Sequence, residues 1–303
     1  MRVITDSAPA AKSILGSGIS WGQMNENGTN YLVNSLFPDV RRLITGDFTE
    51  ENWEILYISS HAKESQFELL CRLMRADKLH SGSIICCALS GENFIGYRNR
   101  SWISIKGNLH LSAFFKPDTI IENFEVGFTI VAAVSLLQTI DDIPGLTGQS
   151  SIKWVNDVQI NGAKVGGIIT HTQVTGMQIN GVVIGLGLNV ERTPRVKRDI
   201  FVPEVTSLSQ FLPCKKREIF RSLIKQLYKN YDLLINGEYL KLLDIYRSRS
   251  SIIGRHAHLY TDPFKGEPKL IADGIVSHIG NNLELYFDNR SEPFYKGRLV
   301  LNP

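Results

Sequence analysis

The segment KWVNDVQINGAKVGGIIT, Lys153–Thr170, decides how the middle of this chain folds. It has the pattern of two strands, SIKWVNDVQI and KVGGIITHTQV, joined at Asn161-Gly162. An Asn-Gly pair accepts the positive φ angles of a two-residue hairpin turn. Residues two apart in a strand share a face, so Lys164 and Gly166 are expected on one side of the sheet. The segment therefore predicts a hairpin with a lysine beside bare glycyl backbone.

The polar residues of this hairpin suit an anionic ligand. A lysine ammonium is a compact positive charge that pairs with a carboxylate or a phosphate, and glycine lets a ligand approach the main chain closely. Asn156 and Asp157 supply oxygen atoms of the kind that Mg²⁺ prefers. The same residues also fit an ordinary surface hairpin, so the local pattern does not name a ligand.

Strand and helix patterns follow one another irregularly on both sides of the hairpin. Strands are predicted in NWEILYIS, GSIICCALS and LHLSAFF, and a strand pair in MQINGVVIGLGLNV. HAKESQFELLCRLMRA predicts an amphipathic helix, ENFEVGFTIVAAVSLLQTI a buried one, and residues 215–248 two helices broken near Asn236-Gly237. After Ser250, four or five short strands predict a small β-barrel module. The fold class expected is α+β: a mixed or antiparallel sheet with packed helices, plus that module.

Three domains are predicted from these patterns. Residues 53–250 form the main α+β unit and residues 251–303 the β-module. Residues 1–52 are rich in glycine, serine and asparagine, with no clear helix-turn-helix pattern. This N-terminal segment is expected to be an irregular extension or a small appended element.

Composition excludes several classes of protein. The 303-residue chain is 43% hydrophobic and 21% charged, which is ordinary for a globular enzyme. A net charge of +3 is too small to indicate nucleic-acid binding. No apolar segment of signal-peptide length begins the chain, and the longest apolar stretch, FTIVAAVSLL, is too short to cross a bilayer. The prediction is a cytoplasmic protein that does not enter a membrane.

Metal and disulfide chemistry are not expected from the cysteines and histidines. The chain has four cysteines and no CxxC motif, and Cys86-Cys87 lies in a predicted strand, where neighbours point to opposite faces. His256 and His258 have a strand-like spacing of two, but no ligand partner lies near them in the sequence.

Four ordered segments resemble biotin protein ligases. KWVNDVQINGAKVGGII is similar to their Lys-Trp-Pro-Asn-Asp turn followed by Lys, a hydrophobic residue and Gly-Gly-Ile, with Val155 in place of the proline. VIGLGLNV and RSWISIKGNLHLS resemble two further blocks of the family, and ISSHA stands where the family has Ser-Thr-Asn ahead of a helix. Their order and spacing match over about Trp53–Ser250, and the β-module matches the SH3-like C-terminal domain of the family.

The resemblance implies a fold and a two-step reaction. The fold is the class II synthetase-like biotin/lipoate ligase fold followed by a small SH3-like β-barrel. With ATP and Mg²⁺, biotin would become biotinyl-5′-AMP, and the biotinyl group would pass to one lysine of a biotin carrier domain of a carboxylase. Such families often dimerise through the catalytic sheet, which leaves a homodimer open for this chain.

The resemblance also implies roles for particular residues. Lys164 would lie between the biotin carboxylate and the α-phosphate, and Arg100 on the phosphate side; these are the expected catalytic residues. The expected biotin contacts are Ser59, Ser60, Gly96, Gly166 and Gly167. The expected ATP contacts are Arg98, Trp102, Asn156, Asp157 and Asn189, with Asp157 as the metal ligand. Trp102 also fits a simple core aromatic.

The arginine-rich loop of the family is altered here. The family pattern Gln-Thr-x-Gly-Arg-Gly-Arg-Arg-Gly-Arg stands before x-Trp, whereas this chain has GENFIGYRNRSW, with Phe94, Ile95, Tyr97 and Asn99 in glycine or arginine positions. A loop two residues shorter is the other alignment. We expect either loop to hold the adenylate less firmly than in typical members.

Three alternatives remain open from the sequence. A lipoate or octanoate protein ligase shares the catalytic fold, although the Gly-Gly after Lys164 favours biotin. A ligand-binding paralogue with weakened activity fits the altered loop. A bifunctional ligase and repressor would need a DNA-binding helix-turn-helix before the catalytic domain, and nucleic-acid binding is not expected.

Overall fold

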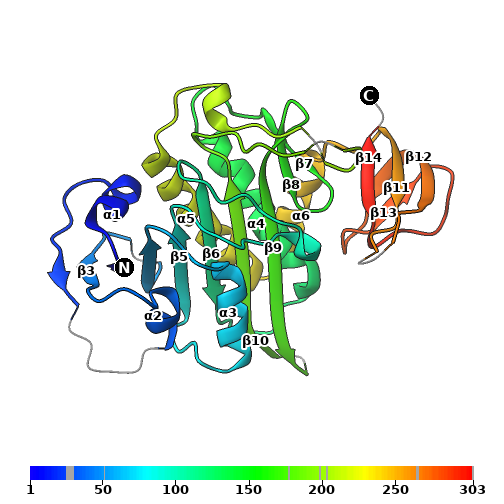
Figure 1. Ribbon diagram of the computed structural model, residues 1–303. Helices are drawn as coiled ribbons and strands as arrows, with labels where there is room; N and C mark the ends of the chain where they lie inside the picture. The colour runs from blue at the N-terminus through cyan, green and yellow to red at the C-terminus, as the bar shows by residue number, and fades with distance from the viewer. Residues whose placement is uncertain are drawn as a thin grey trace.

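A mixed sheet with helices on both faces forms the body of the protein, and a second, smaller sheet lies at the C-terminal end (Figure 1). The computed structural model describes residues 1–24, 31–50, 52–176, 178–197, 199–202, 204–263 and 266–301. In these ranges the large sheet has ten strands and the small one four. The predicted α+β class is confirmed.

The centre of the large sheet contains strands that the sequence predicts. These are β4 (Ile55–Ser59), β5 (Ser83–Ala88), β6 (Leu109–Phe115) and β10 (Gln178–Leu188). β4 and β5 are parallel, while β5–β6 and β6–β10 pair antiparallel. The prediction of a strand pair for MQINGVVIGLGLNV is wrong, because β10 is one strand that pairs with β6 and β9 together. Asn180-Gly181 does not reverse the chain but falls at a register shift, and Met177 lies outside the described residues.

The hairpin segment forms three strands instead of two. The turn at Asn161-Gly162 is confirmed by φ angles of 50° and 79°, and it joins β8 (Asp157–Ile160) to β9 (Ala163–Thr175). The first predicted strand is divided by a tight turn after β7 (Ser150–Lys153). β7 then pairs with β8 as a second hairpin and forms one edge of the sheet.

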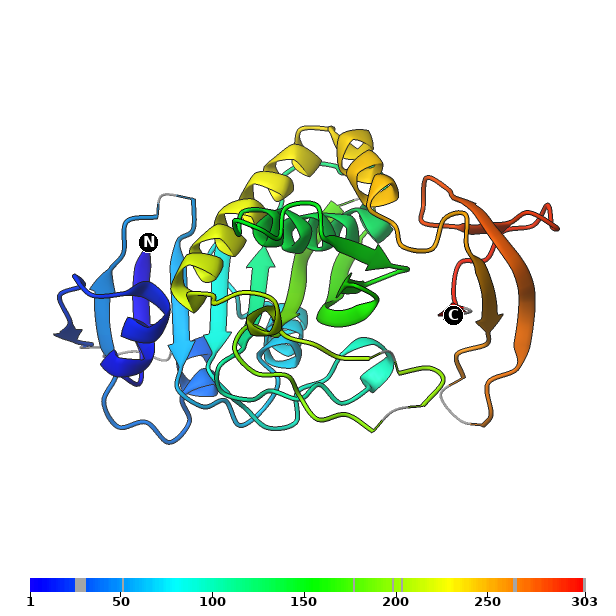
Figure 2. The same ribbon diagram turned by 90° about the horizontal axis from the view of Figure 1, so that it is seen from above.

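Two layers of helices cover the sheet, as Figure 2 shows in a view along it. One face carries α4 (Phe124–Asp141), α5 (Lys216–Ile235) and α6 (Tyr239–Ser248). α1 (Ala8–Leu15) packs against α5 and belongs to the same apolar core. The other face carries α2 (Tyr31–Leu36) and α3 (Gln66–Arg75). Each layer has its own apolar core, one including α4 and α5 and the other α2 and α3.

Successive side chains of β5 point alternately into the two apolar cores. Cys87 belongs to the core under α4 and Cys86 to the core under α3, which confirms that the two thiols point to opposite faces. Both side chains are fully buried, and burial raises the pKa of each thiol. α4 is long and apolar enough to span a membrane by length and composition, but 67% of that helix is buried inside this fold. It serves here as a core helix between the sheet and α5.

The N-terminal segment is part of the large sheet. β1 (Arg2–Thr5) pairs parallel with β4, and β3 (Ile44–Asp47) and β2 (Gly22–Gln23) continue the sheet to its other edge. Of the two alternatives for this segment, the irregular extension is wrong for the described residues. The other alternative, a small appended element, remains a prediction. The sequence concealed these strands because each is only two to four residues long.

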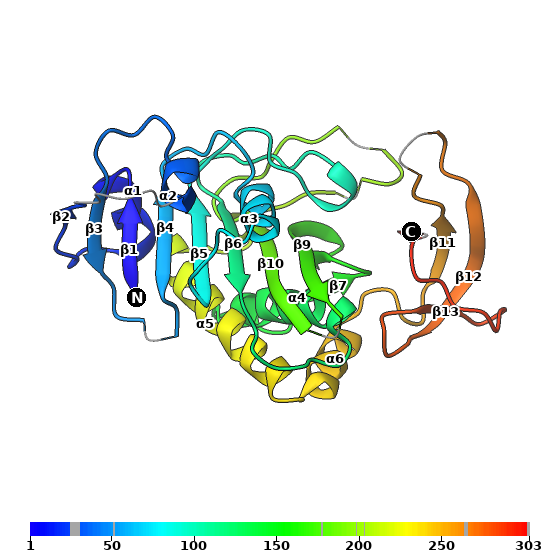
Figure 3. The same cartoon turned by 90° about the horizontal axis from the view of Figure 1, so that it is seen from below.

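The C-terminal module is a four-stranded antiparallel sheet, as the composition after Ser250 predicts. Its strands are β11 (His256–Tyr260), β12 (Leu270–Ile279), β13 (Leu285–Phe287) and β14 (Arg298–Leu301), in the order β13-β12-β11-β14. Figure 3 shows it at the far end of the molecule from the N-terminus. Two 3₁₀ turns, η1 (Tyr97–Asn99) and η2 (Leu208–Gln210), lie in the connections of the main body. The SH3-like assignment and the domain boundaries at residues 52 and 250 remain predictions.

Candidate functional site

A cavity opens on the α3 face of the sheet, between β6, β9 and β10 and the connection that contains η1. Its volume is about 730 Å³ when the open space at its mouth is included. Its side chains include Phe67, Phe94, Trp102, His110, Lys164 and Ile169. Apolar walls with one lysine suit a ligand that is largely hydrophobic and carries a negative charge.

Lys164 reaches this cavity because of a β-bulge. Asp157 pairs with Gly167 and Val158 with Gly166, but Gln159 pairs with Lys164, so Val165 is the extra residue of β9. A bulge shifts the alternation of side chains that follows it. Lys164 therefore shares the cavity with Gly167, and the expectation that Lys164 and Gly166 share a face is wrong.

The Lys164 ammonium is held between a carboxylate and an aromatic ring. Its Nζ lies 2.6 Å from Asp157 Oδ1 and 5.5 Å from the centre of the Trp102 ring. The Lys164 side chain is 23% exposed. An anion that enters the cavity therefore competes with Asp157 for this ammonium.

Trp102 is fixed by a buried histidine on β6. Trp102 Nε1 donates to His110 Nδ1 at 3.2 Å, and His110 Nε2 lies 3.2 Å from the Ile105 carbonyl oxygen. A carbonyl only accepts, so Nε2 carries the proton and Nδ1 is the acceptor. Burial lowers the pKa of His110 to about 4, and the Ile105 hydrogen bond opposes that shift. His110 is therefore neutral near pH 7.

Glycines of β9 and β10 provide the space in which Trp102 lies. A Cβ atom at Gly187 would stand 2.1 Å from Trp102 Cζ2, and one at Gly167 would stand 3.2 Å from Trp102 Cζ3. Gly185 likewise leaves room for Phe67, at 3.0 Å. The GLGLN pattern therefore keeps this face of β10 free of side chains.

Two arginines of the η1 connection meet an acid from the C-terminal module. Arg100 Nη2 donates to Asp262 Oδ2 at 2.8 Å, and Arg98 Nε lies 3.7 Å from the same oxygen. The Asp262 side chain is only 8% exposed. Burial lowers the pKa of Arg298 on β14, the Arg100 charge adds to that shift, and the Asp262 charge opposes it. Three arginines and one carboxylate thus form a cationic cluster at the side of the cavity.

Asn156 and Asp157 lie at the cavity, as expected, together with Gly96, Arg100 and Trp102. Asn156 Nδ2 donates to the Ile168 carbonyl at 2.6 Å, so its amide also fixes β9. Asp157 is the only carboxylate among the described residues that line the cavity. One carboxylate together with ligand phosphates is a usual donor set for Mg²⁺, so this residue fits the expected metal role.

Other expected contacts lie outside the cavity lining. Ser59 is fully buried and accepts from Gln66 Nε2 at 3.2 Å, while Ser60 is exposed and donates to Asp6 Oδ2 at 2.6 Å. Gly166 faces Leu136 of α4. The ligand roles of all the expected site residues remain predictions, both for those that line the cavity and for Ser59, Ser60, Gly166, Arg98 and Asn189.

Asn189 illustrates how buried polar residues shape the site indirectly. Its Nδ2 donates to the Thr206 carbonyl at 3.0 Å, and its Oδ1 accepts from Asn108 Nδ2 at 3.2 Å. Asn108 Oδ1 in turn accepts from the Val190 and Arg192 amides at 3.0 and 3.1 Å. These bonds fix the end of β10 beside the cavity.

Three residues of the site were not predicted as site residues from the sequence: His110, Phe67 and Asp262. His110 lies in the quoted block RSWISIKGNLHLS, so its place between alternating apolar residues was a usable signal. Phe67 reads as the apolar face of a helix, which it also is. Asp262 had no local signal, because only the packing of the C-terminal module brings it to Arg100.

A family model and the names of similar proteins agree on one family. Residues 70–189 match the model of the biotin/lipoate A/B protein ligase family. The chain is 37% identical over 116 residues to the bifunctional ligase/repressor BirA of Bacillus subtilis, covering 38% of this chain and 35% of that protein. It is 31% identical over 109 residues to the biotin–[acetyl-CoA-carboxylase] ligase of Paracoccus denitrificans, covering 35% of this chain and 45% of that protein.

The fold extends further than the sequence match. A biotin protein ligase from Aquifex aeolicus, solved in complex with biotin and ATP, superimposes with a TM-score of 0.61 at 19% identity. The superposition covers 82% of this chain and 98% of that chain, and at this identity it shows a shared fold. The aligned part of this chain spans less than half the length of the two relatives above. Residues 70–189 of this chain are a domain of the biotin/lipoate A/B protein ligase family.

Proposed function

We propose that this protein is an ATP-dependent biotin protein ligase. It forms biotinyl-5′-AMP from biotin and ATP, releases pyrophosphate, and transfers the biotinyl group to one lysine of a biotin carrier domain. The names of the relatives and the shared fold support this proposal.

The position of Lys164 is the observation that carries the proposal. The first step brings two anions together, a carboxylate and the α-phosphate of ATP. A fixed ammonium in a partly enclosed cavity lowers their repulsion and stabilises the charge that develops on the phosphoryl oxygens. Lys164 lines such a cavity beside the open backbone of Gly167.

Other residues of the site would bind and orient the two substrates. The apolar walls at Phe67, Phe94 and Ile169 suit the ring and chain of biotin, while Trp102 offers a flat surface to the adenylate. Arg100 would face the phosphates from the mouth of the cavity. When Mg²⁺ is bound, Asp157 would hold it, and the ion would neutralise phosphate charge.

The second step needs a neutral amine from the acceptor. The lysine of a carrier domain would enter through the open mouth, and its amine would attack the mixed anhydride while AMP leaves. The C-terminal module beside Arg100 is suited to guide the carrier. A carrier domain as partner therefore follows from the proposed reaction.

Intact-mass spectrometry of a carrier domain tests the proposal. The protein is incubated with ATP, Mg²⁺, an apo-carrier domain and either biotin or lipoate. We expect the carrier to gain the mass of biotin less water. Lys164→Ala should slow this transfer by roughly a hundredfold, equivalent to about 3 kcal/mol of transition-state stabilisation.

Lys241→Ala is the matched control, because Lys241 is an exposed lysine on α6 that pairs only with Glu238 in the part of the chain that the structure describes. It should transfer biotin at the unmodified rate. Addition of lipoate but not biotin would assign the chain to the lipoate branch of the family. Addition of neither acid would overturn the ligase proposal and favour a ligand-binding paralogue.

A further inference from the structure

Two histidines of the C-terminal module share the outer face of β11. Ala257 and Leu259 are buried between and after them, so alternation places His256 and His258 on the opposite, outward side. The neighbouring strand β12 supplies the missing third group, because His258 pairs in register with Asp273. Fifteen positions of chain separate the two, so the sequence did not show this partner.

The donor atoms of these three residues have the spacing of a metal site. His256 Nε2 lies 3.3 Å and His258 Nδ1 lies 3.2 Å from Asp273 Oδ1. One ligand atom from each of the three residues lies within 4.8 Å of the other two. Zn²⁺ binds nitrogen and oxygen at about 2.0–2.1 Å, so neighbouring ligands of a tetrahedral ion are roughly 3.3–3.4 Å apart. The two contacts to Asp273 match that separation without movement of the backbone.

A separate observation also indicates a ligand here. The Nδ1 atom of His258 is buried and has no hydrogen-bond partner among the residues that the structure describes. It is close to Asp273 Oδ1 in distance but not aligned for a hydrogen bond. A buried nitrogen without a partner is costly in a folded protein, and coordination to an ion would satisfy its lone pair.

We propose that His256, His258 and Asp273 bind one divalent transition-metal ion, with Zn²⁺ as the best fit. Two of the three ligands are imidazole nitrogens, whereas Mg²⁺ and Ca²⁺ prefer oxygen ligands, so the set suits a transition metal better. The fourth position of the ion is open to water. The site is distinct from Asp157 and from the cavity, because it lies on the C-terminal module.

The site would fix the strand that leads to the arginine cluster. His258 is near Tyr260, with ring centres 6.5 Å apart, and Tyr260 packs edge-on against Phe201 of the main body. Asp262 follows two residues later and binds Arg100. A metal that ties β11 to β12 therefore stabilises the part of the module that contacts the candidate active site.

Cobalt titration of the full chain, prepared without a polyhistidine tag and stripped with a chelator, tests the inference. We expect one equivalent of Co²⁺ to give the strong visible absorption of a four-coordinate ion, and Zn²⁺ to displace it. Asp273→Asn should weaken binding at least tenfold. The side chain of Asp273 is about half exposed, so this variant is expected to fold, as circular dichroism would show.

His278→Asn is the matched control. His278 lies on the same strand as Asp273 but stacks on Tyr286, outside the proposed site. It should bind Co²⁺ as the unmodified chain does. Equal affinity in Asp273→Asn and the unmodified chain, a six-coordinate spectrum, or no binding at all would each overturn the inference. None of these outcomes bears on biotin transfer, which is measured with Mg²⁺ alone.

Discussion

Lys164, Trp102 and His110 act as one unit at the scale of single residues. His110 is buried and neutral, its Nδ1 orients Trp102, and the Trp102 ring lies beside the Lys164 ammonium. The floor of this unit is the bare backbone of Gly187. These side chains support one another, so a substitution at any of these positions should change the free energy of unfolding.

Gly187→Ala should place a methyl group in the volume of the Trp102 indole. Because the added Cβ would stand 2.1 Å from Trp102 Cζ2, the ring must shift, which distorts its hydrogen bond to His110. We expect a loss of about 1–3 kcal/mol in the free energy of unfolding, measured by chemical denaturation. Gly22→Ala on β2 is the control, since the nearest atom to its added Cβ is 4.0 Å away. Equal stability of the two variants would show that Trp102 is not packed as described.

His110 should make the fold less stable in mild acid. The folded pKa of about 4 lies below the ordinary 6.5, so between these values the unfolded chain binds a proton that the folded chain does not. The contribution of His110 to the free energy of unfolding is fully present above pH 6.5. It is lost as the pH falls toward 4, and the total loss is about 3 kcal/mol. The free energy of unfolding, measured by chemical denaturation at several pH values, should therefore fall less steeply between pH 6.5 and 4 in His110→Asn than in the unmodified chain. His80→Asn, at an exposed position, should keep the full slope.

Among the structural elements, the contact between the η1 connection and the C-terminal module bears most directly on the site. Arg98 and Arg100 come from that connection, Arg298 from β14, and Asp262 from the segment after β11. The carboxylate of Asp262 occupies the position of an anion among these cations. A phosphate that enters the cluster must compete with it.

Asp262→Asn should strengthen the binding of ATP. The change removes the internal negative charge that neutralises Arg100 and Arg98, so the guanidinium groups become available to phosphate. We expect the dissociation constant for ATP, measured by calorimetry, to fall by up to about tenfold, or about 1.4 kcal/mol. Asp244→Asn, which removes an exposed charge from α6, should leave it unchanged. Weaker ATP binding in Asp262→Asn would mean that the carboxylate positions the arginines instead of competing with phosphate.

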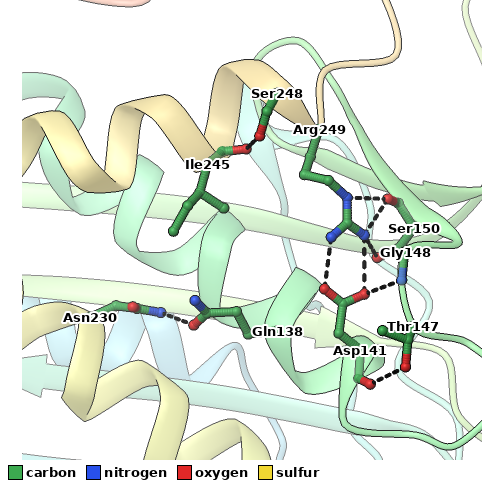
Figure 4. Close-up of polar contacts among 9 residues, drawn as sticks. All are labelled: Gln138, Asp141, Thr147, Gly148, Ser150, Asn230, Ile245, Ser248 and Arg249. Carbon is green, nitrogen blue, oxygen red and sulfur yellow. Dashed lines mark hydrogen bonds and ion pairs between the residues drawn. The ribbon is translucent and has the colours of Figure 1, made fainter.

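For the whole molecule, the main body is held together at the end of α6, just before the chain continues into the module (Figure 4). Arg249, at the end of α6, binds both oxygens of Asp141 at 2.7 and 3.1 Å and the Ser150 carbonyl at 2.7 Å. Asp141 ends α4, and Ser150 begins β7. This one guanidinium thus joins two helices and an edge strand at the point where the chain leaves for the module.

Arg249→Ala should weaken the whole fold. The pair with Asp141 is about four-fifths shielded from solvent, so we expect a loss of about 2 kcal/mol in the free energy of unfolding after allowance for the remaining solvent screening. A double-mutant cycle with Asp141→Ala, followed by thermal denaturation, would isolate the pair. Additive effects of the two changes would show that the ion pair itself contributes nothing.

Much of the fold could be predicted because it depends on neighbours in the chain. The φ preferences of Asn161 and Gly162 set the hairpin turn, and the alternation at Cys86 and Cys87 set two buried faces. The apolar pattern of α4 predicted a core helix, and short strands after Ser250 predicted the module. The site was predictable where it follows a local motif, as at Lys164 and Asp157.

Which residues from distant segments meet depends on long-range packing. The bulge at Val165 aimed Lys164 and Gly167 into one cavity, the strand register brought Asp273 to His258, and the packing of the module brought Asp262 to Arg100. The local elements and the family resemblance could be predicted from the sequence alone, because backbone preferences and side-chain periodicity act over a few residues. Long-range pairing arises when separate elements bury a common surface, so no local pattern contains it.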